Sequence, residues 1–257
     1  EYQNANEEKH RLVMDEKKQT RYELKTGEHI ILKSVLPTEN IEKLKEVANR
    51  LQDSKSRPIY IANEKLLGEH TKKRYESAGM NFILKHAKPW IRRMIGEQIL
   101  ILTNKALIRR TWPLSEAEAR NLGHNASNLT WHQDSNHKHG DKPMIVMMIS
   151  LQDGAGVTRP GLSILQCPTN QFEGVFGYEG NRVDEFEKKI TEQQGELRVT
   201  NPTLNSGDLL LFNGLTFHRT FSNQFMNDHR DALLVRIVRP EHAKNFIKTP
   251  HLIVKTR

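Results

Sequence analysis

The sequence predicts an α+β protein dominated by strands, with a β-barrel-like core and helices on its N-terminal side. Short apolar runs typical of buried strands recur in the second half, as in Met144 to Leu151 and Leu209 to Phe212. Before them, the segment that begins at Thr38 repeats apolar residues at helical spacing. At 257 residues, 36% of them hydrophobic, the chain is long enough for one sizeable core. We therefore expect a single domain over residues 1–257.

The N-terminal third is expected to pack outside that core. Residues 1–27 are mostly charged, and we interpret them as an exposed helix or a loosely ordered arm. A strand is predicted from His29 to Lys33, followed by an amphipathic helix from Thr38. Residues 69–96 are expected to form one or two helices, the second started or kinked by Pro89. The buried positions predicted there are Phe82, Leu84, Ile91 and Met94.

The second half is predicted to supply the core strands. Residues 99–102 and 106–108 flank a polar triplet and form either a hairpin or two separate strands. Residues 168–203 are interpreted as an insertion, a candidate lid or dimer element with a helix over 183–191. Asn213-Gly214 predicts a hairpin turn between the strand at 209–212 and Phe217-His218. The strand after Arg230 is expected to be the last, with residues 241–257 as a tail.

Composition limits the classes of partner. A net charge of +8 favours anionic ligands, but the basic residues are interspersed with glutamates and no nucleic-acid motif occurs, so we expect no nucleic-acid partner. The single cysteine, Cys167, excludes an internal disulfide and predicts a reducing, cytoplasmic compartment. No apolar run approaches the roughly 20 residues of a membrane helix, so we expect no membrane partner. A monomer or homodimer is expected.

A candidate metal site is the main functional signal. In an extended strand, His132 and Asp134 point to the same side, so one imidazole nitrogen and one carboxylate oxygen can reach a single point. His218, at the end of a second predicted strand, is the candidate third ligand. Two histidines and one carboxylate form the facial triad that suits non-haem Fe(II) acting on O2.

An arginine downstream of His218 predicts an anion site beside that metal. Arg230 begins a strand-like run, and its guanidinium can hold the distal carboxylate of a dicarboxylate co-substrate through two hydrogen bonds. Arg236 has the same strand parity, so it either meets an anionic group of the substrate or forms an outer salt bridge. Arg219 adjoins His218 and is expected to point away from the metal.

Three neighbours of the metal motif are further candidates. Thr130 shares strand parity with His132 and is a candidate for contact with the co-substrate. Gln133 and His137 are candidates for contact with substrate, the latter in a hydrophilic loop at the mouth of the site. Trp131 is expected to pack in the core.

The order of these residues resembles the Fe(II)/2-oxoglutarate oxygenases, and within them the phytanoyl-CoA dioxygenase family. His132-Gln133-Asp134 resembles that family's H-Q-D, and Leu151-Gln152-Asp153 its L-D-D. The segments Gly207 to Phe212 and His218-Arg219-Thr220 resemble its G-D-x-x-x-F and H-x-S/T strings. In the stretch from Gly161 to Asn170, interpreted as a loop, only Pro168 of the usual G-x-x-x-x-x-P-G-S-H pattern remains beyond the first glycine, so this chain departs from the family there.

The resemblance implies a double-stranded β-helix, a jelly-roll or cupin-like core, with flanking N-terminal helices. It further implies Fe(II), 2-oxoglutarate and O2 as cofactor and co-substrates, and hydroxylation of an unactivated C–H bond of a small, anionic organic substrate. Because Asp134 stands where halogenating members have alanine or glycine, hydroxylation is favoured over halogenation. The alternatives are a non-redox cupin-like metalloenzyme, an isomerase or hydrolase using zinc, and an inactive binding protein on the same scaffold.

Overall fold

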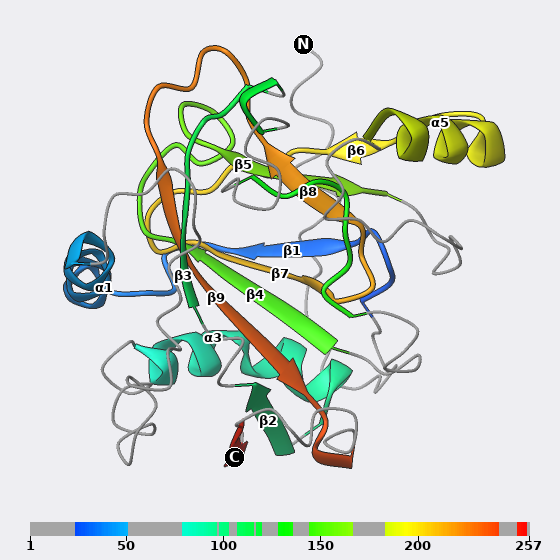
Figure 1. The fold of residues 1–257 in the computed structure, drawn as a ribbon. Coiled ribbons are helices and arrows are strands. Elements are labelled where there is room, and N and C mark those ends of the chain that lie inside the picture. Colours follow the sequence, from blue (N-terminus) through cyan, green and yellow to red (C-terminus); the bar gives the residue numbers. More distant parts are fainter. Residues whose placement is uncertain are drawn as a thin grey trace, which may run out of the picture.

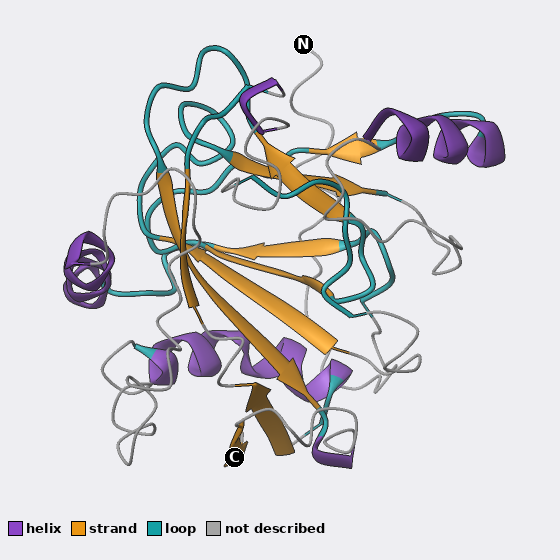
Figure 2. Ribbon diagram, viewed as in Figure 1, coloured by secondary structure: helices purple, strands orange, loops and turns teal. Residues whose placement is uncertain are grey.

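Within the described residues, the main regular elements are two antiparallel β-sheets and the helices α1, α3 and α5 (Figures 1 and 2). The computed structural model describes residues 24–50, 79–96, 98–102, 107–115, 117–119, 128–135, 144–166, 183–241 and 251–255. Among the described helices, none combines the length and apolar character required to span a bilayer.

The larger sheet has the strand order β1-β7-β4-β9-β2-β10, and β3 also pairs with β9. β4 lies at its centre and is buried along its whole length, because both of its edges are paired and both of its faces are covered. β9 is the longest strand, and β4 pairs with it along seven residues. The strands of this sheet are β1 (His29–Leu32), β2 (Gln98–Leu102), β3 (Leu107–Thr111), β4 (Met144–Ser150), β7 (Leu209–Asn213), β9 (Arg230–Val238) and β10 (His251–Lys255).

The smaller sheet has the order β6-β5-β8 and brings the third predicted metal ligand to the site. Its strands are β5 (Gly161–Leu165), β6 (Val199–Thr200) and β8 (His218–Phe221). His218 is the first residue of β8, and its backbone also pairs with His132 in an isolated antiparallel bridge. The segment that carries His132 is therefore held against β8 although it forms no strand of its own.

Strand register separates the larger sheet into a face toward the site and a face toward the helices. Residues directly opposite each other on paired strands share a face, which groups Arg236 with Val146 and Phe212. Phe212 contacts His218 edge to face, with ring centroids 4.8 Å apart, so this is the site face. On the other face, Arg110 donates a hydrogen bond to Asn49 of α1 (Thr38–Arg50).

Helix α3 (Met80–Met94) runs along the larger sheet in Figure 1, and its apolar residues share one core cluster with those of α1 and the sheet. It contains Pro89, so the region predicted as one or two helices has one continuous helix from Met80 onward. Ile91 and Met94 are buried as predicted, whereas Phe82 is 43% exposed. The prediction for Phe82 is wrong because Met80, Ile83 and Ala87 supply the buried face at that end.

A second, smaller core lies behind the metal motif. Helix α5 (Val183–Gln194) places Phe186 and Ile190 against Trp131 and Phe217. Trp131 is 2% exposed, as expected for a core residue. The helix predicted over 183–191 is thus present, and it packs against the chain that precedes His132.

Three predictions of strand connectivity are corrected. Asn213-Gly214 does not close a hairpin, because β7 pairs with β1 and β4 while β8 pairs with β5 in the other sheet. The C-terminal tail contains β10, which pairs with β2, so β9 is not the last strand. Residues 161–165, interpreted as part of a loop, form β5 between β6 and β8.

Some of the remaining predictions are confirmed, and others concern residues outside the described part of the chain. The runs near residues 100 and 107 are two separate strands, since β2 and β3 pair with successive parts of β9. The predicted turn at Ser206-Gly207 is present, and Gly207 adopts a φ of +83°. Residues 1–23, His137, Cys167 and residues 167–182 lie outside the described part of the chain.

Candidate metal centre

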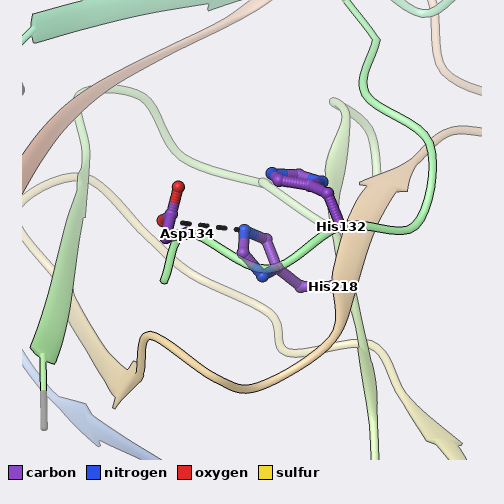
Figure 3. A group of neighbouring side chains, drawn as sticks. All are labelled: His132, Asp134 and His218. Carbon is purple, nitrogen blue, oxygen red and sulfur yellow. Dashed lines mark ion pairs between the residues drawn. The ribbon is translucent and has the colours of Figure 1, made fainter. Parts of the chain in front are cut away.

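His132, Asp134 and His218 converge on one point (Figure 3). One potential ligand atom from each residue lies within 4.8 Å of the others. The two histidine backbones exchange hydrogen bonds of 3.0 Å in both directions, which fixes their imidazoles beside each other with centroids 4.2 Å apart. Asp134 follows two residues after His132, and its Oδ2 atom lies 3.9 Å from Nε2 of His218.

Backbone carbonyls orient both imidazoles. Nδ1 of His132 lies 2.7 Å from the carbonyl oxygen of Thr130, and Nδ1 of His218 lies 3.0 Å from that of Thr216. A carbonyl can only accept, so each Nδ1 carries the proton and each Nε2 presents its lone pair to the centre. Metal-binding histidines are commonly fixed in this way, with the second ring nitrogen donating to a carbonyl or carboxylate.

The carboxylate of Asp134 has one occupied oxygen and one available oxygen. Nη2 of Arg236 donates to Oδ1 over 2.6 Å, with both side chains largely buried. Oδ2 is also buried, and it accepts no hydrogen bond from any described residue. A buried carboxylate oxygen without a hydrogen-bond donor is costly unless a cation binds it, so this arrangement fits a metal ion bound through Oδ2 alone.

The protonation states at neutral pH are those of metal ligands. Burial lowers the pKa of His132 to about 3, helped by the neighbouring His218. Burial also lowers the pKa of His218. Burial raises the pKa of Asp134, but the charge of Arg236 and its hydrogen bond outweigh that effect and hold the pKa well below its ordinary value. The centre therefore offers two neutral imidazoles and one carboxylate before any metal binds.

A buried guanidinium lies on the same face of the sheet. Arg230 is 2% exposed, and its Nη2 donates to the Thr111 hydroxyl over 3.2 Å. Its Nε and Nη1 atoms are buried and have no hydrogen-bond acceptor among the described residues. Burial, followed by the nearby charge of Arg109, lowers the pKa of Arg230 to about 10, so it remains charged at neutral pH. Unsatisfied buried N–H groups on a charged guanidinium fit a bound anion such as a carboxylate.

Arg109 faces the site but was not among the residues predicted from the sequence. This residue lies on β3 directly opposite Ala232, in the row next to the Thr111–Arg230 pair, and so shares the site face. Its positive charge acts on the groups of the site, because it contributes to the lowered pKa of His132, His218 and Arg230. The available signal was the strand-like run Leu107 to Thr111, but the sequence does not say which of two adjacent arginines faces inward. Arg110 lies buried on the opposite face, toward α1, and pairs with Asp231 over 2.8 Å.

The other residues considered for the site from the sequence have different contacts in the structure. Arg236, predicted either to meet substrate or to form an outer salt bridge, is engaged with Asp134. The carbonyl of Thr130 orients His132, while Gln133 donates through Nε2 to the carbonyl of Leu215 over 2.6 Å. Arg219 lies over the Trp131 ring, with its guanidinium carbon 5.2 Å from the centroid, and pairs with Glu187.

Comparison with known proteins identifies the fold. The sequence matches no family model and no curated protein. The structure is similar to the epimerase SnoN in complex with Fe3+, alpha ketoglutarate and nogalamycin RO, with a TM-score of 0.54 and 16% identity over 82% of this chain and 78% of that one. It is also similar to AviO1 from Streptomyces viridochromogenes Tue57, with a TM-score of 0.54 and 13% identity over 86% and 92% of the two chains.

A third similar structure is HygX from Streptomyces hygroscopicus with nickel, 2-oxoglutarate and hygromycin B bound, with a TM-score of 0.54 and 12% identity over 84% of each chain. At these identities the similarity establishes the fold. The protein thus has the strand-rich, cupin-like fold of the non-haem iron and 2-oxoglutarate-dependent enzymes, and within it a group of two histidines and one aspartate arranged to hold a metal ion.

Proposed function

We propose that this protein is an Fe(II)- and 2-oxoglutarate-dependent oxygenase with a double-stranded β-helix core. One observation carries the proposal: two oriented, neutral imidazoles and the unsatisfied Oδ2 of Asp134 lie within 4.8 Å of one another. Bound there, Fe(II) with 2-oxoglutarate and O2 supplies the oxidising power to attack an unactivated C–H bond, with succinate and CO2 as co-products. The resemblance of the motif to the phytanoyl-CoA dioxygenase family supports the same class.

The protein's own groups bind and orient the reactants. His132, Asp134 and His218 would hold Fe(II), which would supply the centre for the reaction of 2-oxoglutarate with O2. Arg230 and Thr111 bind the distal carboxylate of 2-oxoglutarate, because the buried Nε and Nη1 atoms of Arg230 require an acceptor. Arg236 donates a hydrogen bond to Oδ1 of Asp134, so Oδ2 is the oxygen that would bind the metal.

We propose hydroxylation of a small, anionic organic molecule as the reaction. Asp134 would supply a carboxylate ligand where a halide would otherwise have to bind, which disfavours halogenation. The similar structures include an epimerase, so the fold supports more than one outcome and product analysis has to decide. His137 and Thr130 remain proposed contacts to substrate and co-substrate, respectively, and a cytoplasmic location and a monomeric or homodimeric state also remain proposals.

The test uses the full chain, freed of metal and reloaded anaerobically with Fe(II). Addition of 2-oxoglutarate should produce the visible charge-transfer absorption of an Fe(II)–2-oxoglutarate chelate, and admission of O2 should yield succinate. Asp134→Ala should abolish both signals, whereas Glu192→Ala, an exposed helix position, should keep both. If the intact chain shows no charge-transfer absorption and forms no succinate, the proposed oxygenase function is refuted.

The same assay separates the two alternatives. A non-redox zinc enzyme would bind Zn(II) at the same three residues but produce no succinate. An inactive binding protein would form no succinate. If its three residues do not form a metal site, it would also show no saturable Fe(II) binding. The protonation state of the two histidines favours metal binding over a purely structural cluster, because buried neutral imidazoles with fixed Nδ1 atoms are already in the ligand form.

A further inference from the structure

The turn at residues 213–216, between β7 and β8, binds both segments that carry the metal ligands. Three consecutive carbonyl oxygens of this turn accept hydrogen bonds from those segments. The three bonds are Ser135 N–H to Gly214 over 2.9 Å, Gln133 Nε2 to Leu215 over 2.6 Å, and His218 Nδ1 to Thr216 over 3.0 Å. One short stretch of backbone therefore contacts the chain around Asp134 and the imidazole of His218.

Two of these hydrogen bonds hold the backbone of Asp134 from both sides. Gln133 precedes Asp134 and Ser135 follows it, and the two residues bind adjacent carbonyls of the turn. The third bond orients the ring of His218. Because the same turn accepts all three bonds, it sets the position of Asp134 relative to His218, whose Nε2 lies 3.9 Å from Oδ2.

The turn is anchored on buried parts of the fold. The N–H group of Gly214 donates to the carbonyl of Met144 on β4 over 2.8 Å, and a Cβ atom at Gly214 would lie 3.0 Å from that of Met144. The turn is thus packed directly against the central strand. Its bonds to the N-terminal segment are Asn213 Nδ2 to the Leu24 carbonyl over 3.1 Å and Gly27 N–H to the Thr216 hydroxyl over 3.1 Å.

Gln133 makes the one of these three bonds that a substitution can remove while the ligands and the backbone stay. Its acceptor, the carbonyl of Leu215, belongs to a residue that is 3% exposed. The N–H group of Leu215 donates to Oδ1 of Asn213 over 2.9 Å, which fixes the residue that accepts from Gln133. A buried carbonyl that loses its donor is costly, so the segment should move if the Gln133 amide is removed.

We propose that Gln133 is a positioning residue of the metal centre. It holds the backbone of Asp134 where Oδ2 can share a metal ion with the two histidines, while Arg236 fixes the rotation of the carboxylate. The proposal rests on the metal centre of the proposed function. It gives Gln133 a role other than the substrate contact predicted from the sequence.

The experiment titrates the metal-free full chain anaerobically with Co(II), with no 2-oxoglutarate or substrate present. Co(II) is the probe because its visible absorption responds to the arrangement of its ligands. Gln133→Met keeps the approximate length of the side chain and removes the donor. We expect Co(II) affinity to fall about tenfold and the absorption of the saturated site to change. Gln133→Lys, whose ammonium group can donate to the same carbonyl, should return the absorption toward that of the unaltered chain.

Two further variants assign the effect to the turn. Gln166→Met is the matched control, because Gln166 is exposed and its Nε2 donates to the Thr200 hydroxyl in the smaller sheet. It should keep the affinity and the absorption of the unaltered chain. Asn213→Ala loosens the turn from its other side and should change the absorption as Gln133→Met does. In the double variant the loss of affinity should be smaller than the product of the single losses, since both residues act through the turn.

Unchanged Co(II) affinity and absorption in Gln133→Met would overturn the proposal. That holds even if urea unfolds this variant more readily, because the hydrogen bond would then stabilise the fold without positioning a ligand. Failure of the oxygenase function is distinguishable. An intact chain that binds Co(II) but forms no succinate with Fe(II), 2-oxoglutarate and O2 would refute the oxygenase, while the Co(II) comparison would still decide the role of Gln133. An intact chain that binds no Co(II) would overturn both proposals.

Discussion

Arg236 donates from Nη2 to Oδ1 of Asp134 over 2.6 Å, with the two side chains 12% and 9% exposed. The two residues come from different parts of the molecule, β9 and the segment bridged to β8. Their ion pair turns a carboxylate with two equivalent oxygens into one with a single oxygen aimed at the histidines. The larger sheet thereby fixes the geometry of a ligand that it does not itself carry.

Loss of this ion pair should weaken metal binding. In Arg236→Gln, Asp134 keeps at most a neutral hydrogen bond and is free to rotate, so we expect Fe(II) affinity to fall about 10- to 100-fold. Anaerobic titration with Fe(II) or Ni(II) measures the change. Arg198→Gln, which removes an exposed arginine paired with Glu196, is the matched control. Unchanged affinity in Arg236→Gln would show that Asp134 is positioned without the arginine.

Arg230 should control 2-oxoglutarate affinity and not metal affinity. Arg230→Lys keeps a positive charge but loses the planar fork, so half-saturation by 2-oxoglutarate should rise at least about tenfold. Thr111→Val removes the hydroxyl that lies 3.2 Å from Nη2 of Arg230, and a rise of a few fold is expected. Fe(II) titration of both variants should match that of the unaltered chain. Normal 2-oxoglutarate half-saturation in Arg230→Lys would move the anchor to another group.

Glu187 should act as a brace behind the two histidines. Its carboxylate accepts a 2.8 Å hydrogen bond from Nε1 of Trp131 and pairs with Arg219 at 3.4 Å. Trp131 directly precedes His132, and Arg219 directly follows His218. Glu187→Ala should lower the free energy of unfolding by about 1–2 kcal/mol, because a buried indole N–H loses its acceptor.

Urea unfolding measures the Glu187 effect, and Fe(II) titration shows whether it reaches the metal centre. Glu192→Ala is the control on the same helix, since its exposed pair with Lys188 at 3.8 Å should contribute at most a few tenths of a kcal/mol. Equal free energies of unfolding for the two variants would contradict a stabilising role of Glu187 behind the two histidines.

The metal-free protein should lose stability as the pH falls below neutrality. Burial lowers the pKa of His132 to about 3 and also lowers that of His218, whereas a histidine in the unfolded chain titrates near 6.5. Between these values the unfolded chain binds more protons than the folded one, so the free energy of unfolding falls as the pH decreases through about 6.5 toward 3.

We expect the thermal midpoint of the metal-free chain to drop by several degrees between pH 7 and pH 5. In His132→Gln the drop should be smaller, because one of the two groups no longer titrates. His86→Gln, at an exposed position of α3, is the control for removing a surface histidine. A drop in His132→Gln as large as in the unaltered chain would assign the pH dependence to other groups.

Much of the candidate site could be predicted from the sequence because its signals are local. The two-residue spacing of His132 and Asp134 places them on one side of an extended chain wherever that chain lies. Apolar runs likewise predicted β4, β7 and β9, since strands covered on both faces are rich in apolar residues. The apolar residues at helical spacing after Thr38 predicted α1, because such spacing places them on one face of a helix.

Pairing between distant segments could not be predicted in this way. The turn at Asn213-Gly214 has the residues of a hairpin, yet β7 and β8 belong to different sheets, because β7 pairs with β1 and β4 while β8 pairs with β5. Residues 251–255 form β10 only because the edge of β2 offers it partners. Strand propensity specifies which segments extend, and not which segments meet.

The sequence by itself determined the ligand set, two histidines and an aspartate, and the presence of an arginine near the end of a strand. Only the tertiary structure decided that Arg236 serves Asp134, that Arg230 lies buried with unsatisfied N–H groups, and that Arg109 instead of Arg110 faces the site. The physical reason is that side-chain type and spacing are encoded locally. The partner of a buried charge depends on cross-strand register, which forms only when segments far apart in the chain pack together.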